Sequence, residues 1–238
     1  MNIKTIFFVP ARSGSQRIPH KNLSKIGNFS LITIALLKCI KISALNSKVI
    51  LSTDYSEEEL DLPSQVIDNI SVHQRSSNVS GSSSRTEDVV IEYLKQNPDD
   101  QNSIIVLVQC TSPFLSSSSL HQGLTQFKLA SDISISIIAA YPYKSFQWMQ
   151  NKTGYLQPKS YDPFNRQKTQ DMPTYYQECG AFYISHASAY LKGDNRLSSK
   201  VLACPINLLE SLDIDTPDDL LLAQKIGYNG NPDFANTD

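Results

Sequence analysis

Apolar positions along the chain follow two spacings, one typical of strands and one typical of helices. Short runs rich in aliphatic residues predict buried strands: 3–9, 48–52, 103–109, 132–140 and 180–185. Longer apolar or amphipathic segments predict helices: 30–42, a segment capped by Thr86, 117–129 and a segment that begins at Pro217. Strands and helices therefore alternate through most of the chain.

This alternation predicts an α/β fold, in which a Rossmann-like, mainly parallel sheet carries helices on both faces. Ligands of such sheets bind outside the carboxyl ends of the strands. Three loops follow predicted strands at that edge: 10–22, 53–56 and 110–116. We therefore expect the chemistry of the protein in these loops.

Residues 141–178 break the pattern, because aromatic, proline and polar residues dominate and no helical face persists. Within them, 146–150 and 155–157 predict a hairpin. We expect one domain over residues 1–228, with 141–178 as an excursion that serves as a lid or a dimerisation arm. Residues 229–238 lack apolar content and predict a flexible tail.

Composition narrows the class of protein. The chain has 238 residues, with 21 basic and 23 acidic side chains, and the formal net charge of −2 excludes a globally basic nucleic-acid binder. The longest aliphatic run, 104–108, is far shorter than the roughly twenty residues of a membrane span. Four scattered cysteines fit neither a zinc site nor a disulfide framework. We expect a cytoplasmic protein that binds neither nucleic acid nor a membrane.

The loop after the first predicted strand carries the strongest chemical pattern. Three consecutive small residues offer backbone N–H groups that can form an anion nest: Ser13, Gly14 and Ser15. Three cations stand around them: Arg12, Arg17 and Lys21. Forked guanidinium groups and a mobile ammonium together suit an anion with several phosphates. On composition alone, a basic loop that only contacts solvent and binds no ligand fits these residues equally well.

Two acids precede the last predicted helix. Asp213 and Asp215 are two residues apart in extended chain, so both carboxylates can meet one Mg²⁺. Alternatively, these acids only favour the start of the helix, as we expect for Asp218 and Asp219. For the first pair the residues leave both readings open. Elsewhere, Gln109–Pro113 places an amide and two hydroxyls at a strand end.

Together these segments resemble those of the acylneuraminate cytidylyltransferases, the CMP-sialic acid synthetase family, whose relatives activate legionaminate, pseudaminate and 3-deoxy-octulosonate. Five segments carry the resemblance, in order within residues 3–227: 10–22, 52–54, 109–113, 180–184 and 213–220. The first, Pro-Ala-Arg-Ser-Gly-Ser-x-Arg-Ile-Pro-x-Lys-Asn, is the family's signature. The resemblance implies transfer of CMP from CTP to the anomeric hydroxyl of an α-keto sugar acid, with release of pyrophosphate.

With the loop chemistry above, the resemblance also implies roles for individual residues. The implied catalytic residues are Arg12, Lys21 and Asp215. The implied nucleotide-binding residues are Ala11, Arg12, Ser13, Gly14, Ser15, Arg17, Lys21, Asn22, Arg75, Ser84 and Thr86. The implied sugar-binding residues are Gln109, Thr111, Ser112, Arg166, Gln177 and Tyr183. The resemblance further implies Mg²⁺ as cofactor, held by Asp213 and Asp215, and a homodimer joined through 141–178.

Four positions depart from the family's pattern: Gln16, Ser82, Leu115 and Gln177. The first replaces a usual Lys, which Arg17 compensates, and the second stands near a common Asp, so both bear on the use of CTP. The other two each replace a usual Arg and bear on the identity of the sugar. We expect Arg166 or Lys168 to supply the missing sugar-acid contact.

Two classes of function remain open, a working cytidylyltransferase and a nucleotide-sugar-binding paralogue with weak or no catalysis. The first is favoured because the implied cations and both acids are retained. The sequence does not name the sugar. Segments 109–113 and 180–184 look closer to the acylneuraminate branch, which favours a nine-carbon acid.

Overall fold

The computed structural model describes residues 3–81, 84–130 and 132–228. Two features of the sequence, the expected flexible tail over 229–238 and the departure at Ser82, lie outside the described residues.

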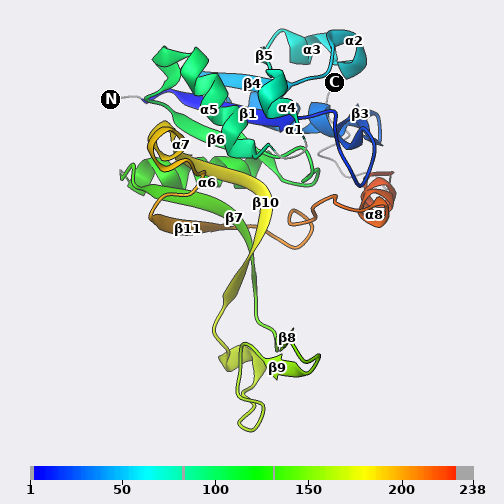
Figure 1. The fold of residues 1–238 in the computed structure, drawn as a ribbon, viewed down its shortest axis with the longest axis vertical. Helices are drawn as coiled ribbons and strands as arrows, with labels where there is room; N and C mark the ends of the chain where they lie inside the picture. Colours follow the sequence, from blue (N-terminus) through cyan, green and yellow to red (C-terminus); the bar gives the residue numbers. More distant parts are fainter. Residues whose placement is uncertain (1–2, 82–83, 131, 229–238) are drawn as a thin grey trace.

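One seven-stranded sheet organises the described residues. Its strands are β1 (Thr5–Ala11), β4 (Ser47–Thr53), β5 (Ser71–Gln74), β6 (Ile104–Val108), β7 (Ile135–Tyr143), β10 (Tyr175–His186) and β11 (Lys200–Pro205). They lie in the order β11-β7-β10-β6-β1-β4-β5 (Figure 1). Neighbours run parallel except where β10 pairs antiparallel with β6 and with β7. The predicted α/β fold with a mainly parallel sheet is confirmed.

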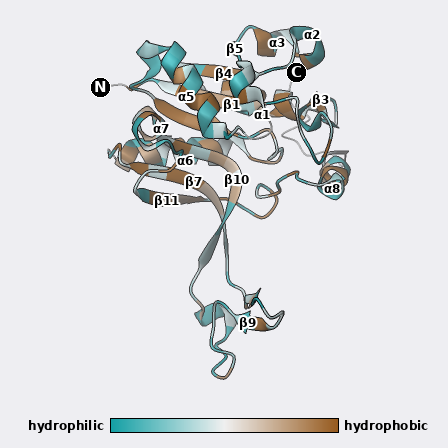
Figure 2. Cartoon of the chain, in the orientation of Figure 1, coloured by the Kyte–Doolittle hydropathy of each residue, from teal (hydrophilic) through white to brown (hydrophobic). Residues whose placement is uncertain are grey.

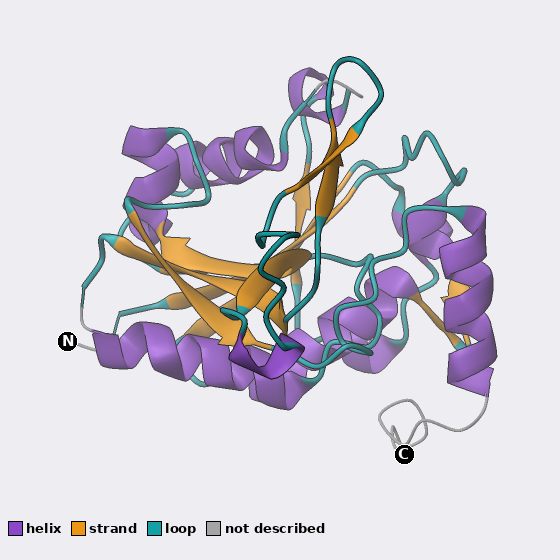
Figure 3. Ribbon diagram, turned by 90° about the horizontal axis from the view of Figure 1, so that it is seen from below, coloured by secondary structure: helices purple, strands orange, loops and turns teal. Residues whose placement is uncertain are grey.

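Helices cover both faces of this sheet, and Figure 3 shows the strands between them. One face carries α1 (Leu31–Ile42) and α6 (Ser117–Ala130), and the other carries α5 (Thr86–Gln96) and α7 (Ala187–Gly193). The short elements are β2 (Lys25–Ile26), β3 (Phe29–Ser30), α2 (Glu57–Leu60), α3 (Ser64–Ile67), α4 (Ser77–Ser80), and the 3₁₀ turns Lys21–Leu23, Pro98–Asp100 and Thr169–Asp171. The last helix, α8 (Pro217–Tyr228), packs beside β2. Among the helices of the described ranges, none has the length and apolar character needed to cross a membrane.

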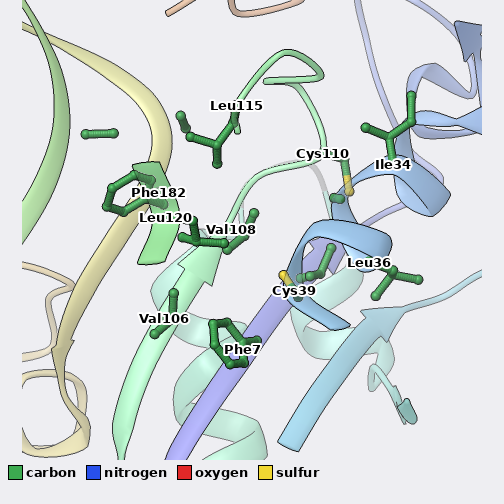
Figure 4. Packing of buried hydrophobic residues seen from close by; sticks show 14 of the residues in the cluster. Phe7, Ile34, Leu36, Cys39, Val106, Val108, Cys110, Leu115, Leu120 and Phe182 are labelled. Carbon is green, nitrogen blue, oxygen red and sulfur yellow. The ribbon is translucent and has the colours of Figure 1, made fainter. Parts of the chain in front are cut away.

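Alternation along β1 explains why both faces are covered. Phe7 and Val9 lie in the core on the α1 and α6 side, while Ile6 and Phe8 lie in the core on the α5 and α7 side. All four side chains are fully buried. Figure 4 shows members of the first core from β1, β6, α1 and α6: Phe7, Val106, Val108, Leu36, Cys39 and Leu120. Figure 2 shows that much of the sheet is built from hydrophobic residues, drawn in brown.

Element boundaries differ from the expectation at two places. β1 does not end at Pro10 but continues to Ala11. A proline is tolerated here because β1 pairs with β6 only as far as Phe8, so no residue of β6 needs a hydrogen bond from position 10. Thr86 does not cap α5 but is its first residue. The cap is Arg85, whose backbone N–H donates to Oδ2 of Asp88 at 2.8 Å.

Among the elements that the sequence pattern does not predict, three belong to the main sheet or pack on it: β5, α7 and β11. β5 and β11 are the two edges of the sheet, where one side of the strand meets solvent. In β11, Val201 and Leu202 are 44 % and 42 % exposed, so the buried-strand pattern is absent. α7 has only seven residues, too few for a clear helical period.

Residues 141–178, called the arm from here on, extend away from the sheet at the bottom of Figure 1. Its base is the outer part of β7 and β10, paired from Ala140 with Glu178 to Tyr143 with Tyr175. The register of this pairing shifts next to Gly180, whose φ of +74° is the left-handed region that favours glycine. Beyond the base, β8 (Trp148–Gln150) pairs with β9 (Leu156–Pro158), which confirms the predicted hairpin.

A buried carboxylate joins three elements at the end of the sheet opposite the loops of interest. Asp100 has no exposed surface and accepts hydrogen bonds from Tyr93 Oη at 2.6 Å, Lys4 Nζ at 2.5 Å and Lys48 Nζ at 3.0 Å. Burial favours the neutral acid, but the bonds from the two lysines and the tyrosine outweigh it and hold the pKa of Asp100 below its ordinary value.

We predict that Asp100→Asn lowers the free energy of unfolding at pH 7 by about 2–3 kcal/mol, because it removes the charge that three donors face. The folded pKa lies below the ordinary value of 3.8, so the contribution is complete above that pH and disappears as the pH falls through the folded pKa. Urea unfolding of both proteins at several pH values measures this difference. The control is Asp99→Asn, at an exposed neighbour. Equal effects of the two substitutions, or a difference that persists in acid, would contradict the prediction.

Candidate active site

The carboxyl ends of β1, β4, β5 and β6 meet at one edge of the sheet, where side chains tie their loops together. Oγ1 of Thr53, at the end of β4, donates to the carbonyl of Ala11, at the end of β1, at 2.7 Å. Nδ2 of Asn22 donates to the carbonyl of Arg12 at 2.9 Å, and Asn22 is only 6 % exposed. Asn22, an implied nucleotide-binding residue, therefore also fixes the conformation of the basic loop.

A second set of bonds brings the segment before α8 to the same edge. Nζ of Lys21 donates to the carbonyl of Ile214 at 2.6 Å and lies 3.4 Å from Oδ1 of Asp215. The N–H of Ile214 donates to the carbonyl of Thr111 at 2.9 Å. Arg17 reaches the other oxygen of Asp215 at 3.1 Å. Residues more than 190 positions apart in the chain thus share one site.

A pocket of about 420 Å³ opens among these loops. Seven of the sequence-predicted residues line it: Arg12, Lys21, Arg75, Ser84, Thr86, Gln109 and Thr111. Five further residues complete the described lining: Pro10, Arg85, Glu87, Val89 and Arg196. None of these five residues is a predicted site residue.

The pocket is strongly cationic although the chain as a whole is slightly acidic. Its described lining holds five basic side chains and one carboxylate, that of Glu87. A concave site with one sign of charge attracts an oppositely charged ligand more strongly than an open surface does. The arrangement suits a multiply charged anion.

Arg75 is the most constrained of these cations. It is 8 % exposed, and its Nε and Nη2 both donate to the carbonyl of Ser52, at 3.2 Å and 3.1 Å. Burial, with a smaller contribution from the neighbouring Arg12, lowers the pKa of Arg75 to about 10, although the charge of Asp54 opposes the shift. An anion bound beside Arg75 would remove this penalty.

The small residues of the basic loop do not form the expected anion nest. Both the N–H and the hydroxyl of Ser13 donate to the carboxylate of Asp54, each at 2.8 Å. The N–H of Ser15 donates back to the carbonyl of Ser13 at 2.9 Å. Two of the three expected N–H groups are therefore used within the chain, and Asp54 emerges as the residue that fixes the turn. Gly14 is exposed at its tip.

The acids before α8 separate into two kinds. Asp219 accepts from the N–H and hydroxyl of Thr216, both at 2.7 Å, and its own N–H donates to the hydroxyl at 3.3 Å. This is the expected helix-start role. Asp218 lies exposed in the same first turn. Asp213 is different, because its Oδ1 is buried and has no hydrogen-bond partner among the described residues.

The orphaned oxygen makes Asp213 and Asp215 a fitting pair for a divalent cation. Burial raises the pKa of Asp213, a bond with Thr111 opposes this, and the charge of Asp215 adds to it, so the two carboxylates repel each other. A cation between them would relieve both costs. Within the described ranges, no cluster of three or more His, Cys, Asp or Glu residues could hold a metal. Ligand oxygens would have to complete the coordination of Mg²⁺.

Some of the implied sugar-binding residues line the pocket and others do not. Gln109 and Thr111 line the pocket, whereas Ser112 is 3 % exposed and does not. Tyr183 was expected at the sugar, but it is buried in the core on the α5 and α7 side, and its hydroxyl donates to Oε1 of Glu178 at 2.5 Å. The alternation of β10 turns this side chain away from open space, so its hydroxyl is not presented to a ligand.

Three other residues that the resemblance links to the sugar lie outside the described lining of this pocket in one copy of the chain. Arg166 lies exposed on the arm, with its guanidinium 4.0 Å from the ring centre of Phe146, and it does not line the pocket. Gln177 is an exposed residue at the arm's base. Leu115, expected to bear on sugar identity, is 1 % exposed and packs in the core (Figure 4). A buried aliphatic side chain cannot contact the sugar directly.

The chain is similar to known proteins over most of its length. A family model described as cytidylyltransferase matches residues 6–229. An N-acylneuraminate cytidylyltransferase of Oncorhynchus mykiss is 31 % identical over 177 residues, which cover 73 % of this chain but only 39 % of that protein. A pseudaminic acid cytidylyltransferase of Campylobacter jejuni is 29 % identical over 245 aligned residues, covering 98 % of this chain and 100 % of that protein. A solved CMP:2-keto-3-deoxy-manno-octonic acid synthetase complexed with CTP shares the fold, with a TM-score of 0.64 and 13 % identity over 96 % of this chain and all of that chain.

We predict that Asn22→Asp lowers the free energy of unfolding by about 1–3 kcal/mol, because a carboxylate would face the carbonyl of Arg12 in place of an amide donor. The same change at exposed Asn28 is the control and should cost less than about 0.5 kcal/mol. Urea unfolding at pH 7 measures both. Equal stability of the two variants would show that Asn22 does not hold the loop.

Proposed function

Because the chain belongs to the cytidylyltransferase family, we propose that it transfers CMP from CTP to the anomeric hydroxyl of an α-keto sugar acid and releases pyrophosphate. One observation carries the proposal, the pocket in which five cations surround the implied nucleotide-binding and sugar-binding residues. Nucleotidyl transfer depends mainly on positioning and charge neutralisation, which such a pocket supplies. The names of the two relatives favour a nine-carbon acid.

In the proposed reaction, the anomeric hydroxyl of the sugar attacks the α-phosphorus of CTP and loses its proton. The bond between the α-phosphorus and the oxygen that links it to the β-phosphate breaks, and pyrophosphate leaves. Arg12 and Lys21 would hold the phosphates, with Lys21 fixed by its bond to Ile214. Negative charge grows on the departing pyrophosphate, so donors already in place stabilise the transition state most. Arg75, which donates to the carbonyl of Ser52, would contact the nucleoside part of CTP.

Asp213 and Asp215 would hold Mg²⁺, which supplies charge neutralisation at phosphate oxygens when it is bound. Asp215 also forms ion pairs with Lys21 and Arg17, and so would orient both cations toward the same phosphates. We further propose a cytoplasmic location. CTP as substrate supports it, as do the free, buried thiols of all four cysteines, which suit a reducing compartment.

Pyrophosphate release tests the proposal directly. The protein is mixed with Mg²⁺, CTP and one of four acids: N-acetylneuraminic, pseudaminic, N,N′-diacetyllegionaminic or 3-deoxy-manno-octulosonic acid. We expect release with CTP and a nine-carbon acid, and none with ATP. Binding of CTP without release from any acid would instead identify a nucleotide-binding paralogue. Absence of CTP binding would contradict both readings.

For the metal, we predict that Asp215→Asn raises the Mg²⁺ concentration needed for half-maximal turnover about tenfold or more, because half of the proposed ligand pair loses its charge. The fold should remain intact, since Asp215 is exposed. Asp219→Asn is the matched control, because the side chain of Asp219 accepts hydrogen bonds from the N–H of Asp215 and from Thr216, which an amide oxygen also accepts. A magnesium titration of turnover measures both variants. If they behave alike, Asp215 does not bind the metal.

For assembly, we propose a homodimer joined through the arm. Six of its large hydrophobic side chains are strongly exposed in one copy of the chain: Trp148, Met149, Tyr155, Leu156, Phe164 and Tyr176. Burying such side chains against a second copy would stabilise a dimer, since aromatic residues dominate interface energetics. The arm's reach beyond the sheet leaves these residues accessible to a partner (Figure 1).

We predict by light scattering a mass twice that of one chain at micromolar concentration. Leu156→Asp should weaken the dimer about tenfold or more, because a charge would be buried at the interface. Leu45→Asp, at a fully exposed leucine remote from the arm in the sequence, should leave the dimer unchanged. A monomeric wild type, or equal effects of the two substitutions, would overturn the proposal.

A further inference from the structure

Arg196 lines the pocket but has no part in the function described so far. It comes from the loop between α7 and β11, and its side chain is 19 % exposed. Its guanidinium lies over the ring of Tyr183, 4.7 Å from the ring centre. Its Nε donates to Oε1 of Glu87, in the first turn of α5, at 2.5 Å. Two elements therefore fix the direction of this cation.

The position of Arg196 in the sheet separates it from the phosphate-binding loop. Tyr183, beneath it, belongs to β10, and the N–H of Gln109 donates to the carbonyl of Ala181 in the same strand at 3.1 Å. Arg12 follows β1, and β6 lies between β1 and β10. The pocket thus has one end at Arg12 and Arg75, which follow β1 and β5, and a second end at β6 and β10, which Gln109 and Arg196 line.

Two ion pairs hold the loop of Arg196 against the start of α5. In the first, Arg85 beside α5 binds the carboxylate of Asp194 in the loop at 2.8 Å. In the second, two residues further along both segments, the charges are reversed: Glu87 of α5 binds Arg196 of the loop. Burial opposes the charged form of Arg196, but the hydrogen bond and charge of Glu87 outweigh it and raise its pKa. The guanidinium remains a cation despite its partial burial. Glu87 occupies the Nε side of the fork, and the two terminal nitrogens are the donors suited to a bidentate anion.

We propose that Arg196 binds the carboxylate of the sugar acid at the second end of the pocket, with Glu87 as its positioning residue. The inference rests on the proposed function, which supplies an acceptor whose carboxylate is attached to the reacting anomeric carbon. A planar guanidinium matches a planar carboxylate with two parallel bonds, which an ammonium does not. Arg166 and Lys168, the residues expected for this contact, lie on the arm rather than in the pocket of their own chain.

Steady-state kinetics with the acid of the four that gives the fastest release test this proposal. Arg196→Lys and Arg196→Ala should raise the KM for the sugar acid about tenfold and a hundredfold, and the KM for CTP less than about twofold. Asp194→Asn is the control, because it removes the other ion pair of the same loop and keeps Arg196. Asn also tolerates the left-handed backbone of position 194, where φ is +50°. Its KM values should stay within about twofold of the wild type.

The C1 methyl ester of the same acid separates recognition from a structural role, because esterification removes the carboxylate charge. The wild type should bind the ester about tenfold or more weakly than the acid, measured as inhibition constants, and Arg196→Ala should bind both nearly equally. Retained discrimination in Arg196→Ala, a larger effect on CTP than on the sugar, or equal losses in Asp194→Asn would overturn the role of Arg196. Failure of the wild type to release pyrophosphate with every acid would instead overturn the proposed function.

Discussion

The rest of this structure depends on the burial of β1 on both faces between two parallel strands. Ile6 and Phe8 fill one core while Phe7 and Val9 fill the other, so a slip of one residue would exchange the two sets and misplace every side chain. The register with β4 aligns Ala11 with Thr53. The basic loop, Asp54 and the end of β6 therefore emerge together at one edge, where ligands of parallel sheets bind.

The acids of this edge position the cations more than they neutralise them. Asp54 fixes the turn of the basic loop by accepting a hydrogen bond from Ser13. Asp215 forms an ion pair with Lys21, and Glu87 forms one with Arg196. The pocket itself keeps five cations against one carboxylate, although the whole chain carries a formal charge of −2. A local field of this kind attracts multiply charged anions without making the surface generally basic. Side chains fixed in this way need little reorganisation when charge develops during the reaction.

Sequence patterns predicted those features that depend on local spacing. The apolar runs predicted five strands of the sheet, and the basic loop placed Arg12 and Lys21 in the pocket. They failed where the outcome depends on distant segments. The spacing of Asp213 and Asp215 left two roles open, and only the packing of the whole chain makes one oxygen of Asp213 an orphan. Likewise, Leu115 follows a loop motif but enters the core, and Arg196 follows a short helix that shows no sequence pattern.

The proposed CTP site lies at the carboxyl edge of the sheet and has two ends, one for the nucleotide and one for the acceptor. A crystal structure of the protein with CTP and Mg²⁺ would show where the nucleotide binds. We expect the triphosphate beside Arg12 and Lys21, the nucleoside near Arg75, and the metal at Asp213 and Asp215, with Arg196 left to bind the acceptor. CTP bound in another cavity, such as the one of about 400 Å³ between β3 and α2, would contradict this expectation.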